Sequence, residues 1–417
     1  MKQLRIAMFS IHSNPIGELG TEDTGGMSVY IRELARELGR RGHRIDVFTR
    51  RLNGRHRPVI DLFQNVRLVH LDLPNNGNLS RLGFYPYLPD LFKSIEKFKS
   101  REGLAYDLIH SHYWLSGRLG SWAQERWDCP HLVMLHTLGE AKKRTGVGRP
   151  ESELRIAAEK ELADTCHRIL APTEREKSNL VRYYRIDEEK IGVVPCGVNL
   201  DLFQPEQKQV TRKELGFERD EIILLNVGRF EPLKGIDRLL EAVDYLRDQE
   251  RLRLVIVGGD GSEAPESKAL RQKAKDLGIE NKITFAGRIE QRYLPLYYSA
   301  ADVLVIASHY ESFGLVALEA LACGRPVVST PVGAMESLIE RSQAGYVVND
   351  CLPLSLAEGI QSIINSSALP QADTIRNSVL AYSWSNVSAA ILREYETAIR
   401  HQALEEDHRV PARASCG

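Results

Sequence analysis

Two basic residues, Arg229 and Lys234, lie close together near the middle of the chain. The guanidinium offers a planar fork of donors and the ammonium a compact charge, and both suit the oxygens of a diphosphate. The apolar run 222–227 directly before them predicts a strand. Because ligands of doubly wound sheets bind at the carboxyl ends of strands, the two cations predict a diphosphate site.

Two carboxylates, Glu311 and Glu319, flank the apolar run 313–318. In one continuous helix their spacing would leave them about 80° apart around the axis, so they would not share one face closely. We therefore expect Glu311 in the loop before a helix and Glu319 inside that helix, where burial requires a polar partner. Carboxylate oxygens in a crevice suit the hydroxyls of a sugar or a ribose. The alternative is a structural pair, with Glu311 as a cap and Glu319 in a buried ion pair.

A pair of glycines, Gly25 and Gly26, precedes an amphipathic helix predicted over about 28–41. Glycines at a helix N-terminus let phosphate oxygens approach the backbone N–H groups at the positive end of the helix dipole. A simple turn is the alternative interpretation. The loop lacks the Gly-x-Gly-x-x-Gly pattern, so it does not indicate a nicotinamide or flavin dinucleotide.

A histidine, His136, ends the apolar run 132–135, with Lys142 close behind and Arg155 further on. A histidine at the carboxyl end of a strand is a candidate polar group beside a reacting sugar, and the basic residues are candidates for binding an anionic acceptor. The alternative is a structural histidine. His110 and His112 fall in the same region, but their spacing does not define a metal site.

The chain contains no Asp-x-Asp pair that could clamp a metal-bound diphosphate. We therefore expect Arg229 and Lys234 to neutralise the diphosphate in its place, with no metal requirement and no prosthetic group. The six cysteines are scattered without a close pair, which favours reduced thiols over a zinc site or a disulfide scaffold.

Apolar runs typical of strands alternate with helical patterns along the whole chain, which predicts an α/β fold with parallel sheets. The predicted strands of the first half are 4–11, 45–49, 108–110, 132–136 and 168–172. The pattern restarts at 222–227 and continues at 252–257, 283–285, 303–306 and 326–329. We expect two doubly wound domains, the first over 1–199 and the second over 200–384. A helix over 385–400 is expected to pack back on the first domain, before a flexible tail over 401–417.

The chain carries 55 Lys and Arg against 56 Asp and Glu, which gives no basic field for nucleic acid. Its start shows no signal-peptide pattern, and no apolar run is long enough to span a bilayer. Together with the free thiols, this predicts a cytoplasmic protein without an integral membrane segment. The sequence leaves the oligomeric state open, a homodimer included.

Taken together, these motifs resemble glycosyltransferase family four, whose members are retaining enzymes with the GT-B fold of two Rossmann-like domains facing across a crevice. The family pattern combines a Gly-Gly loop before the first helix, Gly-Arg-x-x-x-x-Lys-Gly, and Glu-Ser-Phe-Gly-Leu followed by a second Glu. The matching positions here are 25–26, 228–235 and 311–319, and the resemblance extends from residue 4 to about 398.

The resemblance implies a nucleotide-diphosphate sugar as donor, with UDP-glucose and UDP-N-acetylglucosamine as the candidates. It implies that Gly26 meets the donor phosphate, that Arg229 and Lys234 stabilise the departing diphosphate, and that Glu319 holds the ribose. Glu311 would touch the donor sugar, with His136 beside it. Further donor contacts are implied at Gly25, Met27, Ser312, Phe313, Gly314 and Leu315.

Within the family, the segments 25–34, 111–117 and 136–139 resemble the inositol-phosphate N-acetylglucosaminyltransferase of mycothiol synthesis and the sucrose-phosphate synthases. Both use phosphorylated acceptors, so the resemblance implies inositol phosphate or fructose 6-phosphate. The implied acceptor contacts are Arg81, Tyr113, Thr137, Lys142 and Arg155. The chain departs from these relatives in the neighbours of Arg81, where they tend to carry Lys-Glu-Glu-Leu, and at Met27, where sucrose-phosphate synthases favour Gln.

Three other functions fit the same two-domain architecture. A non-hydrolysing nucleotide-sugar epimerase would need no acceptor, and a phosphorylase would carry pyridoxal phosphate. A sugar-nucleotide-binding protein without catalysis would have no reason to keep Arg229, Lys234 and both glutamates. We expect a transferase acting on a nucleotide sugar and a small polar acceptor.

Overall fold

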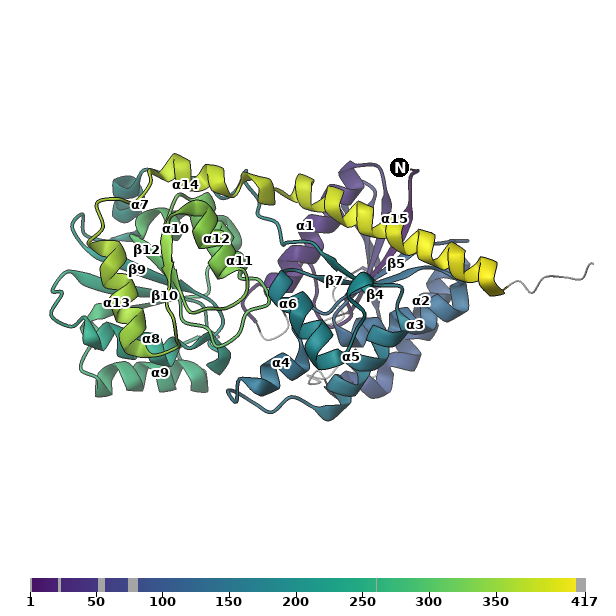
Figure 1. Cartoon of the computed structure of the whole chain (residues 1–417), viewed down its shortest axis with the longest axis horizontal. Helices are drawn as coiled ribbons and strands as arrows, with labels where there is room; N and C mark the ends of the chain where they lie inside the picture. Colours follow the sequence, from purple (N-terminus) through teal and green to yellow (C-terminus); the bar gives the residue numbers. More distant parts are fainter. Residues whose placement is uncertain (1, 22–23, 52–56, 74–81, 260, 410–417) are drawn as a thin grey trace, which may run out of the picture.

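The computed structural model describes residues 2–21, 24–51, 57–73, 82–259 and 261–409. It contains two mainly parallel sheets, each covered by helices on both faces, and the two lie side by side along the long axis of the molecule (Figure 1). This arrangement confirms the doubly wound α/β architecture that the alternation of strands and helices predicts.

The first sheet has eight strands in the order β3-β4-β2-β1-β5-β6-β7-β8. Their bounds are β1 Arg5–Phe9, β2 Arg44–Arg50, β3 Val59–Phe63, β4 Val66–Leu71, β5 Leu108–His112, β6 His131–Met134, β7 Arg168–Ala171 and β8 Ile191–Val193. The helices of this half are α1 Gly26–Arg40, α2 Leu88–Arg101, α3 Trp114–Trp127, α4 Gly139–Arg144, α5 Glu153–Thr165 and α6 Glu174–Asn179. The central strands are buried on both faces, as parallel sheets require.

The second sheet has six strands in the order β11-β10-β9-β12-β13-β14. Their bounds are β9 Ile222–Val227, β10 Leu252–Val257, β11 Ile283–Gly287, β12 Val303–Ile306, β13 Val327–Ser329 and β14 Gly345–Val347. The helices are α7 Lys208–Leu215, α8 Ile236–Tyr245, α9 Pro265–Asp276, α10 Leu294–Ala300, α11 Leu315–Ala322, α12 Met335–Ser342, α13 Pro353–Ile364 and α14 Ala372–Ser378.

Strands β3 and β4 on one side of the first sheet and the edge strand β14 of the second were not among the strands predicted from the sequence. β3 pairs with β4 in the antiparallel sense, so the first sheet is not purely parallel. Strand β4 carries Arg67 and His70 among its apolar residues, and β14 has only three residues. Both features weaken the apolar pattern by which a strand is recognised.

The last helix, α15 (Trp384–Arg409), crosses back and lies along the first sheet, as the long yellow helix of Figure 1 shows. Tyr395 of this helix bonds through its hydroxyl to Nδ1 of His110 in β5, 2.8 Å away. The carboxylate of Glu394 lies 2.6 Å from Nε of Arg168 at the start of β7. The helix runs to Arg409, past the end near residue 400 that the sequence suggested.

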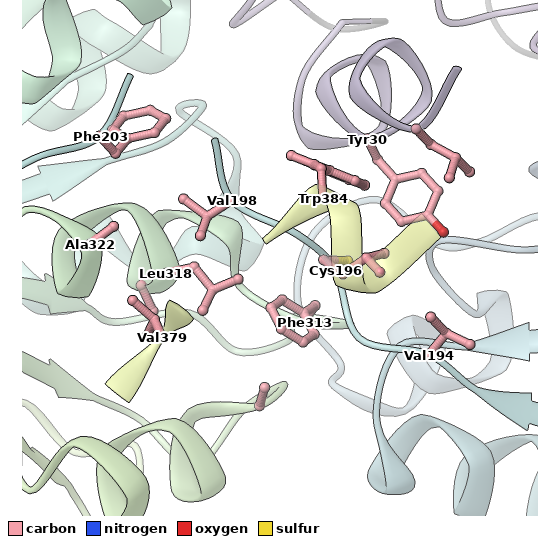
Figure 2. Close-up of a cluster of buried hydrophobic side chains, with 14 of the residues drawn as sticks. Tyr30, Val194, Cys196, Val198, Phe203, Phe313, Leu318, Ala322, Val379 and Trp384 are labelled. Carbon is pink, nitrogen blue, oxygen red and sulfur yellow. The ribbon is translucent and has the colours of Figure 1, made fainter. Parts of the chain in front are cut away.

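An apolar junction joins the two halves where the chain leaves the first sheet and where it returns (Figure 2). It is formed by Tyr30, Val194, Cys196, Val198, Phe203, Phe313, Leu318 and Trp384. The two crossing segments pair directly, since the backbone N–H of Val198 donates to the carbonyl of Tyr382 over 2.9 Å. Arg376 also links these segments, because its guanidinium donates to the carbonyls of Leu200 and Ala322.

Candidate active site

A cavity of about 340 Å³ opens between the carboxyl ends of the two sheets. Its walls include the loops after β1, β5, β6, β9, β11 and β12, together with the first turn of α1. Among the described residues it gathers every site residue predicted from the sequence except Arg155. Arg81 lies outside the described residues. Motifs that are far apart in the sequence thus line one cavity, as expected if ligands bind at the carboxyl ends of the strands.

The two predicted cations approach the cavity from the loop after β9, and each is held by a carboxylate. Nζ of Lys234 lies 2.6 Å from Oε1 of Glu311, which also accepts from the hydroxyl of Ser308 at 2.8 Å. Arg229 pairs with Glu231 over 2.8 Å. These ion pairs, which are only partly exposed, orient the two cations at the cavity wall.

The turn that presents Lys234 depends on Gly235, whose φ of +62° is unfavourable for residues with a side chain. A Cβ atom there would stand 2.0 Å from the carbonyl oxygen of Ala307 at the end of β12. Only glycine therefore lets the loop after β9 pack so closely against the loop that carries Glu311.

The two glutamates lie as the spacing argument predicted. Helix α11 begins at Leu315, so Glu311 is in the preceding loop and Glu319 is in the second turn. Glu319 is 8% exposed and accepts a hydrogen bond from the hydroxyl of Tyr298, 2.7 Å away, which is the polar partner its burial requires. Burial raises the pKa of Glu319 to about 7.

The start of helix α1 faces these loops directly. Gly25 is its N-cap and has no side chain that could accept from the first N–H groups. A Cβ on Gly26 would lie 3.2 Å from Leu315, and one on Gly25 would lie 3.9 Å from Nε of Arg229. The N-terminus of α1, which no N-cap side chain covers, thus lies beside Arg229 of the second domain, an arrangement suited to an anion.

Two residues on the first-sheet side of the cavity adopt the left-handed backbone conformation although they are not glycine. Tyr113 has a φ of +74° and His136 a φ of +60°. Nε2 of His136 lies 2.9 Å from Nδ1 of the buried His112, so one ring orients the other. Burial, and secondarily the nearby His110, lower the pKa of His136 to about 3. His136 is therefore neutral near pH 7 and acts as a hydrogen-bonding group.

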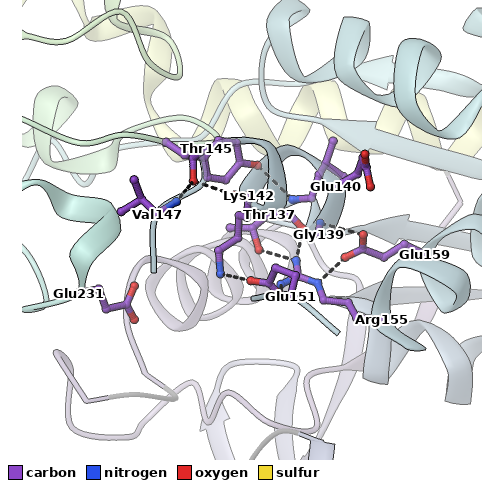
Figure 3. A network of polar contacts seen from close by, with 12 residues as sticks. Thr137, Gly139, Glu140, Lys142, Thr145, Val147, Glu151, Arg155, Glu159 and Glu231 are labelled. Atoms are coloured by element: carbon purple, nitrogen blue, oxygen red, sulfur yellow. Dashed lines mark hydrogen bonds and ion pairs between the residues drawn. The ribbon is translucent and has the colours of Figure 1, made fainter. Parts of the chain in front are cut away.

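Arg155 is buried behind the cavity wall in a network of polar contacts (Figure 3). Its guanidinium donates to Glu151 over 2.9 Å, to Glu159 over 2.7 Å, and to the carbonyl and hydroxyl oxygens of Thr137 over 2.7 and 2.9 Å. It also lies 4.9 Å from the ring centre of Tyr113. Arg155 does not reach the cavity but holds two residues that do.

Lys142 is the basic residue that this network leaves at the cavity surface. Its Nζ lies 2.5 Å from Oε1 of Glu151, and its side chain is 18% exposed. Tyr113, Thr137 and Lys142 thus form one polar wall on the first sheet, opposite Lys234 and Glu311 on the second.

Comparisons with known proteins match both halves of the chain. The family model described as Glycosyltransferase Family 4 covers residues 24–202, and the model described as Glycosyl transferases group 1 covers residues 207–378. A D-inositol 3-phosphate glycosyltransferase of Geodermatophilus obscurus is 36% identical over 98% of this chain and 92% of its own length. The chain belongs to glycosyltransferase family 4.

Solved structures agree with this assignment. The glycosyltransferase superposes on a sucrose-phosphate synthase of Thermosynechococcus elongatus with a TM-score of 0.87 and 29% identity, over 95% of this chain and all of that one. It shares its fold with Anabaena HepE, solved in complex with UDP-glucose, with a TM-score of 0.68 and 20% identity over 97% of this chain and 100% of that one. These matches confirm the GT-B architecture and the transferase class that the motifs implied.

The sequence did not indicate several residues that line the cavity of the glycosyltransferase. They are His12, Tyr30, Cys196, Arg288, Gln291 and Tyr310. At least three of them could have been found by the rule that succeeded elsewhere, because His12 follows β1, Arg288 follows β11 and Tyr310 follows β12. Tyr30 and Cys196 line the cavity because of packing at the apolar junction, and no local sequence motif predicts that packing.

Within the described residues, no group of three or more His, Cys, Asp or Glu side chains gathers closely enough to hold a metal ion. In that same part of the chain, each helix is too short or too polar to cross a membrane.

Glu319→Gln is expected to change how the stability of the glycosyltransferase depends on pH. The folded-state pKa near 7 lies above the ordinary value of 4.5, so the folded state favours the protonated acid. The stability this contributes is fully present below about pH 4.5 and is lost as the pH rises through 7. Between pH 5 and pH 8 the wild type should lose about 1 to 3 kcal/mol relative to the variant. Chemical denaturation at both pH values measures the difference, and a constant gap would contradict the prediction.

Proposed function

We propose that this glycosyltransferase moves a hexosyl group, with retention, from a UDP-sugar to a small phosphorylated acceptor. UDP-glucose and UDP-N-acetylglucosamine are the donor candidates, and inositol phosphate and fructose 6-phosphate are the acceptor candidates. The observation that carries the proposal is the cavity itself, in which Lys234 and Glu311 stand opposite Tyr113, Thr137 and Lys142. Residues 1–199 would bind the acceptor and residues 200–384 the donor.

The donor would lie along the loops of the second sheet. Its diphosphate would meet the N–H groups at Gly26 and the cations Arg229 and Lys234, while Glu319 would accept from the ribose hydroxyls. The departing diphosphate gains charge as the glycosidic bond breaks, and cations already aimed at that charge stabilise the transition state most effectively. UDP as the nucleotide is supported by the UDP-glucose bound to HepE, which shares this fold.

The sugar would sit between Glu311 and His136. Because His136 is neutral near pH 7, its role would be to donate or accept a hydrogen bond with a sugar hydroxyl. Glu311 bonds to Lys234 and Ser308, so its carboxylate is fixed in direction before the sugar arrives. Fixed polar groups of this kind orient the anomeric carbon toward the acceptor hydroxyl, which in a retaining transfer attacks from the face of the leaving group.

A phosphorylated acceptor is supported by charge and by relatives. Lys142 places an ammonium on the first-sheet wall beside Glu151, while the charge of the buried Arg155 is balanced by Glu151 and Glu159. The curated relative is named for an inositol phosphate, and the structural relative for sucrose phosphate.

A matrix of donors and acceptors tests the proposed function. UDP-, GDP- and ADP-sugars are each incubated with inositol phosphate, fructose 6-phosphate and the unphosphorylated sugars, and the free nucleotide is measured. We expect turnover with a UDP-sugar and one phosphorylated acceptor. A new sugar nucleotide formed from UDP-N-acetylglucosamine alone would instead identify an epimerase, and transfer only to a lipid or polysaccharide would refute the phosphorylated acceptor.

Arg229→Ala and Lys234→Ala are each expected to lower kcat about a hundredfold, because each removes a cation from the departing diphosphate. Steady-state kinetics with the donor found in the matrix measures the effect. Lys268→Ala serves as the control, since Lys268 is 60% exposed on α9 and should leave kcat unchanged. Near-normal kcat in both cavity variants would contradict their assignment.

Lys142→Ala is expected to raise KM for the phosphorylated acceptor about tenfold, because the charge that would meet the phosphate is lost. The KM for the matching unphosphorylated sugar should change little. Lys143 provides the matched control, because its side chain is 48% exposed and pairs with the exposed Glu153 away from the cavity. An equal effect of Lys142→Ala on both acceptors would argue against a phosphate contact.

A further inference from the structure

Tyr310 belongs to the loop after β12 of the second sheet, but its side chain bonds to the first domain. Its hydroxyl donates to Oε1 of Glu176 in α6 over 2.6 Å. The hydroxyl oxygen of Tyr310 also accepts a hydrogen bond from the backbone N–H of Leu138 over 3.0 Å. One phenol thus connects two separate segments of the first domain to a loop of the second.

Tyr310 also links the two loops that form opposite walls of the cavity. Leu138 directly follows His136 and Thr137 on the first-sheet wall. Glu311 directly follows Tyr310 and pairs with Lys234 on the second-sheet wall. Tyr310 and Glu311, adjacent in one loop, therefore contact opposite walls of the cavity. A shift of Tyr310 would move the loop that carries Leu138 relative to the loop that carries Glu311.

Other contacts cross the same gap, but they are more exposed or longer. Arg175 donates to the carbonyl of Pro331 over 2.6 Å and pairs with Glu336, although both charged side chains are nearly half exposed. The hydroxyl of Thr173 reaches the carbonyl of Ser312 only at 3.5 Å. Exposed ion pairs contribute little, whereas Glu176 is 4% exposed and loses a buried bond if Tyr310 is displaced.

We propose that Tyr310 is a positioning residue for glycosyl transfer, which fixes the loop 136–139 against the donor loop 308–315. It acts through Leu138 and Glu176 on one side and through Glu311 on the other. The inference relies on the proposed function only in naming the 136–142 wall the acceptor side. A misplacement of about 1 Å between reacting groups can lower turnover by two orders of magnitude, so a single buried link at this point has a large effect on catalysis.

Tyr310→Phe tests the proposal by removing one oxygen atom and keeping the ring. We expect kcat/KM for the acceptor to fall at least tenfold, while the affinity for UDP, measured by calorimetry, stays within twofold of the wild type. UDP binding should persist because Arg229, Lys234 and Glu319 belong to the second sheet. Tyr245→Phe is the matched control, since Tyr245 is 61% exposed at the end of α8 and should change neither value.

Variants of Glu176 keep the proposal testable if the phenylalanine variant folds poorly. Glu176→Gln retains an oxygen that accepts from Tyr310 and should keep kcat/KM within about threefold of the wild type. Glu176→Ala removes that acceptor and should lower kcat/KM in the same direction as Tyr310→Phe. Because both act through one link, the double variant should lose no more than Tyr310→Phe alone.

Two results would overturn the positioning role. One is a parallel loss of UDP affinity and acceptor kcat/KM in Tyr310→Phe, which would make Tyr310 part of the donor site. The other is a lowered melting temperature with unchanged kinetics, which would make the link merely structural. The kinetics use the acceptor that the wild type turns over. If the proposed acceptor class is wrong, the wild-type matrix shows it. The ratio of variant to wild-type kcat/KM is still measured with the acceptor that works.

Discussion

The apolar junction between the two sheets is the constraint on which the active site depends, because two facing walls form a site only if their separation is fixed. Trp384 lies at its centre, and the backbone at Gly197 approaches the indole so closely that a Cβ would stand 2.6 Å from the ring. The ring of Tyr30 packs edge-on against the rings of Trp384 and His136, with distances of 5.3 and 5.2 Å between ring centroids. Packing at the junction therefore reaches His136 on the first-sheet wall of the cavity through the side chain of Tyr30.

Charge within the cavity follows from the same geometry. Each of the cations Arg229, Lys234 and Lys142 has a carboxylate within ion-pair distance, so none faces the others uncompensated. A partly buried cation without a partner would be costly, and pairing with a carboxylate also orients the cation. In the proposed complex, a diphosphate would bring further negative charge to Arg229 and Lys234, and the carboxylates would then hold the cations in place.

The sequence predicted what local patterns encode and failed where distant packing decides. Arg229 and Glu311 were located because both directly follow central strands, and a buried Glu319 was recognised from the apolar residues around it. Its partner Tyr298 was not predictable, because that contact depends on how α10 packs against α11. Arg155 was taken for an acceptor contact because a basic residue in a crevice segment suggests a ligand. Packing instead surrounds it with Glu151 and Glu159, each four residues away on α5 or its approach.

The two walls of the cavity are held rigid by different means, and the difference matches their chemistry. Turns such as the one at Gly235 shape the second wall, so backbone geometry fixes the groups that would meet a diphosphate. On the first wall, Tyr113 and His136 are held in an unfavourable backbone conformation, which persists only because buried partners surround them. Arg155 supports one and His112 the other. Side chains thus define the first wall, and substitutions among them can reshape it while the glycine turns that present the cations stay intact.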